Sequence, residues 1–233
     1  MRDVLVFGNK SFSEFNTFTD LSKAFGTAKK TREYYDIEGR NGSLASSSYR
    51  FEDIVLSFPC FIRSDFITNY RSLMAYLSSV DGYQKLESSK EPNYFRKACF
   101  EGGIDPQTTP FNHGGYFTVE FRCNPQRWLK SGEEWVSFTA DGSIFNPTLQ
   151  TAKPIIRIYG TGSVMIGSKT ITVSTAGTNY IDFDCETQDA YEGSNNRNSN
   201  ISTNFDEIGL APGLTGIDLT GVTVDIMPRW WDI

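Results

Sequence analysis

The chain has 233 residues, a length that suits one large domain or two modest ones. Its hydrophobic fraction of 39% and aromatic fraction of 14% exclude a disordered chain, because such a composition can bury a core. The formal net charge is −6 and the 22 Lys and Arg residues never form a run of three, which argues against tight or sequence-specific nucleic-acid binding.

The N-terminal half predicts short strands. Strands are expected at residues 4–8, 34–37, 54–60, 94–100 and 116–123, where apolar residues cluster or alternate with polar ones. Residues 39–42, Gly-Arg-Asn-Gly, are typical of a tight hairpin turn, because Asn-Gly tolerates positive φ. Pro59 predicts a sheet edge or an irregularity near the end of the third strand.

One helix is expected after the third strand. Apolar residues recur at helical spacing behind Ser64 and Asp65, which can cap the first turn, and Gly82 ends the segment. These apolar residues are Phe66, Ile67, Tyr70, Leu73, Met74 and Leu77. A stripe of this kind is core packing rather than a cofactor site.

A long loop is predicted between the fourth and fifth strands. Residues 101–115 contain four Gly, two Pro and two Thr and offer little to bury. They are expected to form an exposed hairpin loop or extended arm, and long loops of this kind are often functional.

From Asn124 onward the pattern changes to short strands separated by Gly, Asn and Pro. Strands are expected at residues 155–159, 163–166, 169–173, 180–185 and 222–227, with a two-residue turn at Gly167-Ser168 and a polar loop over 192–200. The pattern predicts an all-β sandwich. We therefore expect a mainly β protein with two domains, residues 1–130 and 131–233.

A set of segments spread along the whole chain resembles a known family. In the N-terminal half they are residues 6–11, 37–42, 82–86, 92–98 and 115–125, the last reading Gly-Tyr-Phe-Thr-Val-Glu-Phe-Arg-Cys-Asn-Pro. In the C-terminal half they are residues 146–148, 154–160, 181–186, 210–213 and 228–231. In this order and spacing the chain resembles the distal tail (Dit) proteins of siphophages that infect Gram-positive bacteria.

The resemblance implies a structural protein of the phage virion. Its N-terminal β-rich domain would form a ring, typically a hexamer, around a conduit for DNA, and its C-terminal domain would be a galectin-like β-sandwich. The implied partners are the major tail tube protein, a tail-tip protein and the receptor-binding or baseplate proteins. An acidic chain fits a conduit for DNA, because negative charges repel the DNA phosphates and would not retain the DNA. A net charge of −6 is equally explained by its contribution to solubility.

No catalytic, cofactor-binding or metal-binding residue is predicted. The only histidine, His113, lies in a Gly-rich loop, and no nucleophile-base pair or phosphate-binding loop is recognisable. Carboxylates at Asp182, Asp184 and Glu186, and at Glu133-Glu134, are expected to form solvated surface rather than a calcium site. The protein is expected not to be an enzyme.

Compartment and membrane behaviour follow from further sequence features. No apolar stretch approaches the roughly 20 residues of a membrane span, and the first residues lack a signal-peptide pattern, so we expect no membrane insertion and synthesis in the host cytoplasm. The four cysteines, Cys60, Cys99, Cys123 and Cys185, lie far apart and are expected to be buried free thiols rather than disulfides or metal ligands.

The main alternative function is a carbohydrate-binding module, since tail tips meet cell-wall glycans. Residues 131–233 contain no histidine for a lectin-type site. Trp230 and Trp231 are adjacent, so on a strand they point to opposite faces and cannot form one stacking platform. We expect one to be core and the other to contact a partner.

Overall fold

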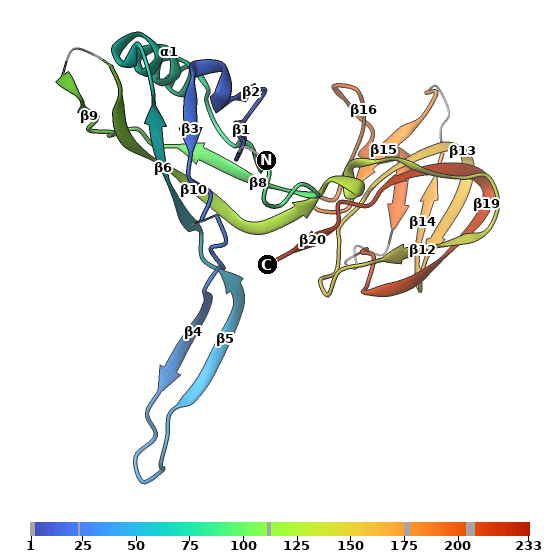
Figure 1. Ribbon diagram of the computed structural model, residues 1–233. Helices are drawn as coiled ribbons and strands as arrows, with labels where there is room; N and C mark the ends of the chain where they lie inside the picture. Colours follow the sequence, from blue (N-terminus) through green and yellow to red (C-terminus); the bar gives the residue numbers. More distant parts are fainter. Residues whose placement is uncertain (1–2, 23, 111–112, 175–177, 204–207) are drawn as a thin grey trace. The chain divides into compact units, whose positions relative to one another are not determined.

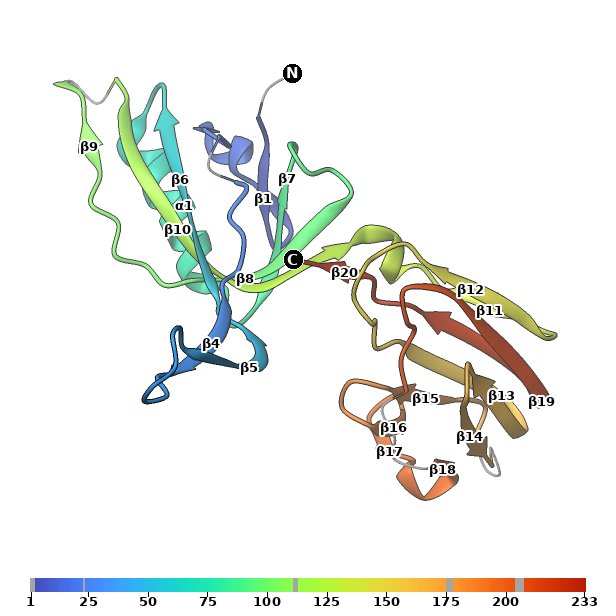
Figure 2. The same cartoon turned by 90° about the horizontal axis from the view of Figure 1, so that it is seen from below.

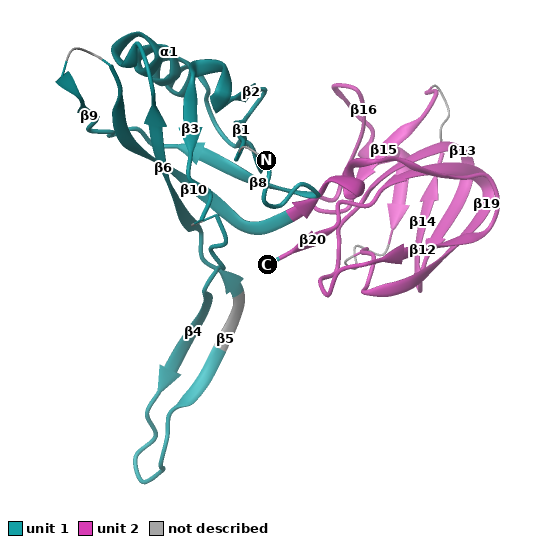
Figure 3. Ribbon diagram, in the orientation of Figure 1, with its two compact units in different colours: residues 1–127, 233 teal, residues 128–232 magenta. Residues whose placement is uncertain are grey.

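The computed structural model describes residues 3–22, 24–110, 113–174, 178–203 and 208–233 (Figure 1). The fold is mainly β, as predicted, and this part of the chain contains a single α-helix. It divides into two compact units, residues 1–127 together with Ile233, and residues 128–232 (Figure 3).

The main sheet of the first unit has the strand order β2-β1-β7-β8-β10-β6-β3. Its strands are β1 (Leu5–Phe7), β2 (Lys10–Ser11), β3 (Thr17–Thr19), β6 (Ile54–Ile62), β7 (Gln84–Ser88), β8 (Tyr94–Phe100) and β10 (Gly115–Leu129). The short 3-10 helix η1 (Phe12–Phe15) connects β2 to β3. Strand β6 runs past Pro59 to Ile62, and its pairing with β3 ends at Cys60, directly beside the proline.

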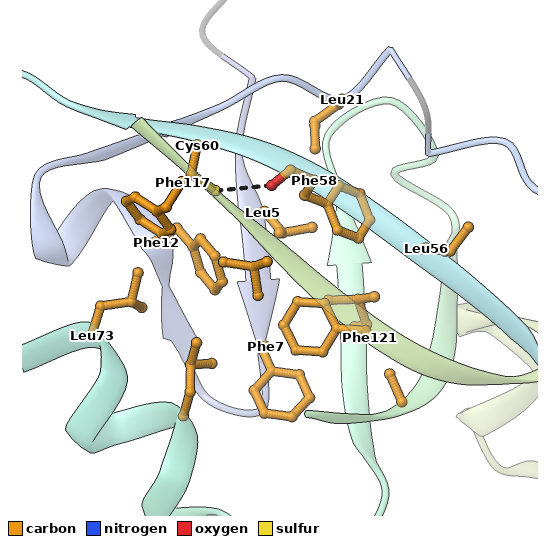
Figure 4. Close-up of a cluster of buried hydrophobic side chains, with 14 of the residues drawn as sticks. Leu5, Phe7, Phe12, Leu21, Leu56, Phe58, Cys60, Leu73, Phe117 and Phe121 are labelled. Atoms are coloured by element: carbon orange, nitrogen blue, oxygen red, sulfur yellow. Dashed lines mark hydrogen bonds between the residues drawn. The ribbon is translucent and has the colours of Figure 1, made fainter. Parts of the chain in front are cut away.

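The core of this unit forms because β6 and β10 pair antiparallel and direct alternate side chains to one face. Phe58 and Phe121 meet Phe7 from β1 in an aromatic cluster, with 4.7 Å between the ring centroids of Phe7 and Phe121 (Figure 4). Helix α1 (Phe66–Ser79) covers the cluster and buries Phe66, Leu73 and Leu77. Tyr70 and Met74 of the predicted stripe are partly buried against the same core, whereas Ile67 is 44% exposed and does not belong to it.

The start of α1 differs from the expected cap. Asp65 occupies the N-cap position with φ +50°, outside the extended conformation usual there, and its side chain makes no capping hydrogen bond. Instead, the Asn69 side-chain amide donates to the carbonyls of Ser64 and Asp65. Asn69 therefore holds the turn before the helix through two carbonyls, but it does not replace a cap that accepts from the first amides of the helix.

A separate two-stranded ribbon belongs to the first unit. It consists of β4 (Lys30–Tyr35) and β5 (Leu44–Phe51), which pair antiparallel with each other. In both views the ribbon extends away from the main sheet (Figures 1 and 2). It is the extended arm of this unit, whereas the sequence placed the arm at residues 101–115.

The second unit is built on one curled sheet of order β11-β19-β13-β15-β16-β17, with β12 also on β19, and β14 joining β13 to β18. Its strands are β11 (Val136–Phe138), β12 (Gly142–Asn146), β13 (Ile155–Ile166), β14 (Lys169–Val173), β15 (Ile181–Asp184), β16 (Asp189–Glu192), β17 (Asn195–Asn196), β18 (Ile201–Thr203) and β19 (Gly213–Met227). The two-residue strand β20 (Trp231–Asp232) pairs with β10. Two further 3-10 helices are η3 (Lys130–Glu133) and η4 (Asn198–Asn200).

The predicted strands 155–159 and 163–166 form one strand, β13, that pairs with β19 along its length. The pairing register shifts between Gly160 and Ser163. A Cβ on Gly162 would lie 1.9 Å from the Thr220 carbonyl oxygen, so only glycine permits this close approach. At one end of the β13–β19 pair, β19 also pairs with β11 and β13 with β15. At the other end, β19 pairs with β12 and β13 with β14. The buried side chains from both ends form a single core.

Candidate assembly surfaces

The β4–β5 ribbon exposes apolar side chains on both of its faces. Tyr35 is paired with Leu44, and Tyr34 with Ala45, so the two pairs point to opposite faces. Tyr34 is 64% exposed and Tyr35 52% exposed. A two-stranded ribbon is at best marginally stable alone in water, and none of its described side chains, those of residues 30–35, 44–46 and 50–51, is buried. Its residues are therefore suited to contact another protein surface.

Local polar contacts shape the end of the ribbon. The Ser43 hydroxyl donates to Asp36 over 2.6 Å, across a loop in which Gly39 and Gly42 have φ +80° and +82°. The Tyr35 hydroxyl donates to Glu33, and this hydrogen bond raises the pKa of Tyr35. The hydrogen-bonded turn is Ile37–Arg40, in which the Arg40 amide donates to the Ile37 carbonyl, and it lies in a longer loop over residues 36–43, so the tight hairpin turn predicted at 39–42 is not formed.

Residues 101–110 and 113–115 lie against the first unit rather than projecting from it. Glu101 pairs with Arg122 at 2.6 Å, and the Tyr70 hydroxyl donates to the Ile104 carbonyl at 3.2 Å. The short strand β9 (Gln107–Thr108) pairs with the start of β10. His113 is exposed in this loop. A segment poor in apolar residues is thus held by backbone pairing and a surface ion pair.

A row of polar side chains crosses the outer face of the second unit. The strand register aligns Ser137, Asp225, Arg157, Asp182 and Tyr191 across β11, β19, β13, β15 and β16. Arg157 donates to both carboxylate oxygens of Asp182, at 2.7 and 2.9 Å, and this pairing raises the pKa of Arg157. Asp225 accepts hydrogen bonds from the hydroxyls of Ser137 and Tyr159.

Two aromatic rings flank Arg157. Its guanidinium carbon lies 4.9 Å from the Trp135 ring centroid and 4.4 Å from that of Tyr180. Such cation–π contacts add to the bidentate ion pair and fix the arginine in place. Trp135 is the more exposed of the two rings. Composition alone could have drawn attention to Trp135, but its partners come from strands distant in the sequence.

Two of the five carboxylates expected to be solvated, Asp182 and Asp184, are buried, which corrects that expectation for them, whereas Glu133, Glu134 and Glu186 are exposed. Asp182 is 5% exposed and Asp184 is 7% exposed. Asp184 accepts two hydrogen bonds from Arg229, which also reaches Glu186 at 3.4 Å. Both aspartates are buried because each has an arginine partner to compensate the loss of water. Within the residues described, no group of three or more His, Cys, Asp or Glu side chains is arranged to hold a metal ion.

The adjacent tryptophans have different surroundings. Trp230 is 5% exposed and belongs to the core of the second unit. Trp231 packs against the same core and its indole N–H donates to the Thr151 carbonyl at 3.1 Å. Trp231 is therefore partly enclosed by its own unit, unlike a side chain that is fully exposed to a binding partner.

An uncharged surface lies along β12. Residues 135–152 contain one charged side chain, Asp141, which accepts from the Leu219 amide at 2.7 Å. Phe145 on β12 is paired with Leu214 on β19, and both are largely exposed, as is Leu149 in the following turn. Residues 208–217 on the neighbouring segment carry no charge at all. Sequence periodicity did not reveal this surface, although the absence of charge was visible.

The cysteines are free thiols in the structure. Cys60, Cys123 and Cys185 are buried, as predicted, while Cys99 is only partly buried. Burial raises the pKa of Cys60 and of Cys123 to about 12 in each case. None of the helices described has the length and apolar character needed to cross a membrane.

No family model matches the chain. No curated protein matches it either. Among solved structures, the chain is similar to the SPP1 Dit protein, described as a paradigm of the hub adsorption apparatus in phages that infect Gram-positive bacteria. That likeness covers 100% of both chains with a TM-score of 0.72 at 13% identity. A chain in the structure of the phage P2 baseplate in its activated conformation with Ca is also similar, with a TM-score of 0.53 at 10% identity over 97% of both chains.

Proposed function

We propose, from the fold that this chain shares with SPP1 Dit along its whole length, that it is a structural distal tail protein of a siphophage. In this proposal the chain forms a hexameric ring at the tail tip, between the tail tube and the baseplate or receptor-binding proteins. The ring surrounds the conduit for DNA, and the protein has no enzymatic activity. The single observation that carries the proposal is the likeness over both units, since a hub needs both a ring-forming and a docking part.

The proposed roles divide between the units. Residues 1–130 form the ring, and residues 131–233 form a galectin-like sandwich that holds a receptor-binding or baseplate protein. The tail tube protein and a tail-tip protein contact the ring. The site of action is the virion tail tip, after synthesis in the host cytoplasm.

The β4–β5 ribbon supports the proposed ring, because its described apolar side chains are not packed into a core within the single chain and could be covered by a neighbouring subunit. Tyr35 and Leu44 on one face and Tyr34 on the other remain exposed within the single chain. Burying apolar area stabilises an interface by roughly 25 cal/mol per Å². We assign the ribbon to the contact with the neighbouring subunit, which would cover these side chains.

The test is the mass of the assembled protein. Native mass spectrometry of the full chain should show a closed oligomer of six copies. The variant with Tyr35→Ser and Leu44→Ser should shift the population toward monomer at micromolar concentration, because the apolar contact is lost. Tyr83→Ser is the matched control, since Tyr83 is 49% exposed in the same unit but outside the ribbon. A chain that stays monomeric up to near-millimolar concentration refutes the ring.

A carbohydrate-binding module remains the second candidate, and one observation favours it. Trp135, Arg157 and Tyr180 place aromatic rings beside fixed polar groups on an open sheet face, a combination found in many ligand sites. Arg157 and Asp182, however, satisfy each other, which favours a structural role. Titration of the full chain with host cell-wall polysaccharide separates the two, because saturable binding tighter than roughly 1 mM, about −4 kcal/mol, would support the module.

A further inference from the structure

Strand β12 is an unprotected sheet edge. Among the strands described, it pairs only with β19, so its other side meets no strand. Natural proteins guard such edges with Lys, Pro or bulges, because unpaired backbone groups recruit further strands. Strand β12 itself reads Gly-Ser-Ile-Phe-Asn and contains neither charge nor proline.

The side chains beside this edge add a second, independent observation. Phe145 is 62% exposed and its cross-strand neighbour Leu214 is 72% exposed. They lie within a surface depleted of charge, and charge depletion with exposed aromatic residues marks the centre of a protein interface. An exposed apolar patch next to an open edge satisfies both requirements of strand addition, backbone pairing and side-chain anchoring.

We propose that β12 accepts an extended, uncharged strand of a different tail protein, which joins the sheet beside β12 and packs an apolar side chain on Phe145 and Leu214. This inference rests on the proposed ring for the choice of occupant. Neighbours in a cyclic ring are related by rotation about the ring axis, so two β12 edges cannot face each other within one ring. The edge is therefore open to another protein.

Hydrogen exchange of the backbone amides of residues 142–146 tests the proposal in three states: the isolated full chain, the purified ring, and complete phage tails. For the amides of this strand that face away from β19, we expect rapid exchange in the chain and in the ring, and exchange slowed by about tenfold or more in complete tails, because the added strand would accept their hydrogen bonds. Slow exchange in the ring alone identifies a second copy as the occupant and overturns the proposal. Rapid exchange in complete tails overturns it as well.

Substitutions at the edge provide a second measurement. Phe145→Lys combined with Leu214→Glu adds charges at exposed positions, so folding and ring mass should be unchanged while incorporation of the chain into infectious tails falls by about tenfold or more. Thr172→Lys is the matched control, because Thr172 is exposed on β14, a strand paired on both sides. Normal incorporation of the double variant overturns the proposal. If no ring forms but exchange at residues 142–146 still slows in tails, only the ring proposal fails.

Discussion

Trp230 and Trp231 are adjacent in the sequence but contribute differently to the second unit. Trp230 is enclosed by the core, whereas Trp231 is half-buried at its margin. Trp230→Ala should lower the free energy of unfolding by about 3–5 kcal/mol, the range for removing a buried tryptophan. Trp231→Ala should cost less, because fewer contacts and one hydrogen bond are lost. Urea denaturation of both variants measures this, and equal losses would contradict the assignment of Trp230 to the core.

The cysteine thiols should react with a thiol-alkylating reagent in a fixed order. Burial raises the pKa of Cys60 and Cys123 to about 12, so both remain neutral thiols at pH 8 and gain reactive thiolate only as the pH approaches 12. Cys99, which is partly exposed, should be labelled first. Mass spectrometry of the native protein at pH 8 gives the order, and Cys99→Ser should abolish the fast phase. Rapid labelling of Cys60 would show that the core of the first unit opens to solvent in the native protein.

At the scale of elements, the bend in β13 depends on a glycine. A methyl group at Gly162 would overlap the Thr220 carbonyl oxygen, and backbone atoms cannot move aside cheaply. Gly162→Ala should therefore destabilise the second unit by about 1–3 kcal/mol. Gly216→Ala is the control, because nothing lies within 4 Å of the added carbon on that glycine of β19. Thermal unfolding compares the two, and equal melting temperatures would contradict the close approach.

The elements that the sequence predicted well are those with strong local patterns. Residues 54–60 alternate cleanly because one face of β6 is buried, and the stripe of α1 repeats at helical spacing because it covers one core. Of the ribbon, the sequence predicted only a strand at 34–37 and a turn at 39–42, and it missed β5, because exposed side chains leave no hydrophobic periodicity. Strand β12 was missed for a related reason, since it alternates over only five residues.

The candidate surfaces were harder to predict than the strands. Arg157 and Asp182 are 25 residues apart in the sequence and meet only through the register of β13 and β15. Alternating carboxylates usually face water, so nothing local indicated that Asp182 and Asp184 would be buried. Strand register across a sheet is a long-range property, and it decides which charges find a partner.

For the whole molecule, the two cores predict two independently folding pieces. Residues 1–127 and 128–233 should each be soluble when expressed separately, because each unit has its own buried cluster. The first piece should form the ring, and the second should remain monomeric at micromolar concentration while still binding its tail partner. Light scattering of both pieces checks this. A multimeric second piece with a monomeric first piece would reverse the assigned roles.

The ribbon has a consequence for the timing of assembly. Fixing a backbone residue costs roughly 1–2 kcal/mol of conformational entropy, and a ribbon without a core recovers little of that by itself. In the proposed ring, the first two copies to meet bear this ordering cost before any closed contact exists, while a copy that completes the ring gains two contacts at once. Small open oligomers are then disfavoured relative to the closed ring. Ring formation should show a lag and a concentration threshold, so the tail tip would begin to form only after enough subunits have accumulated in the infected cell.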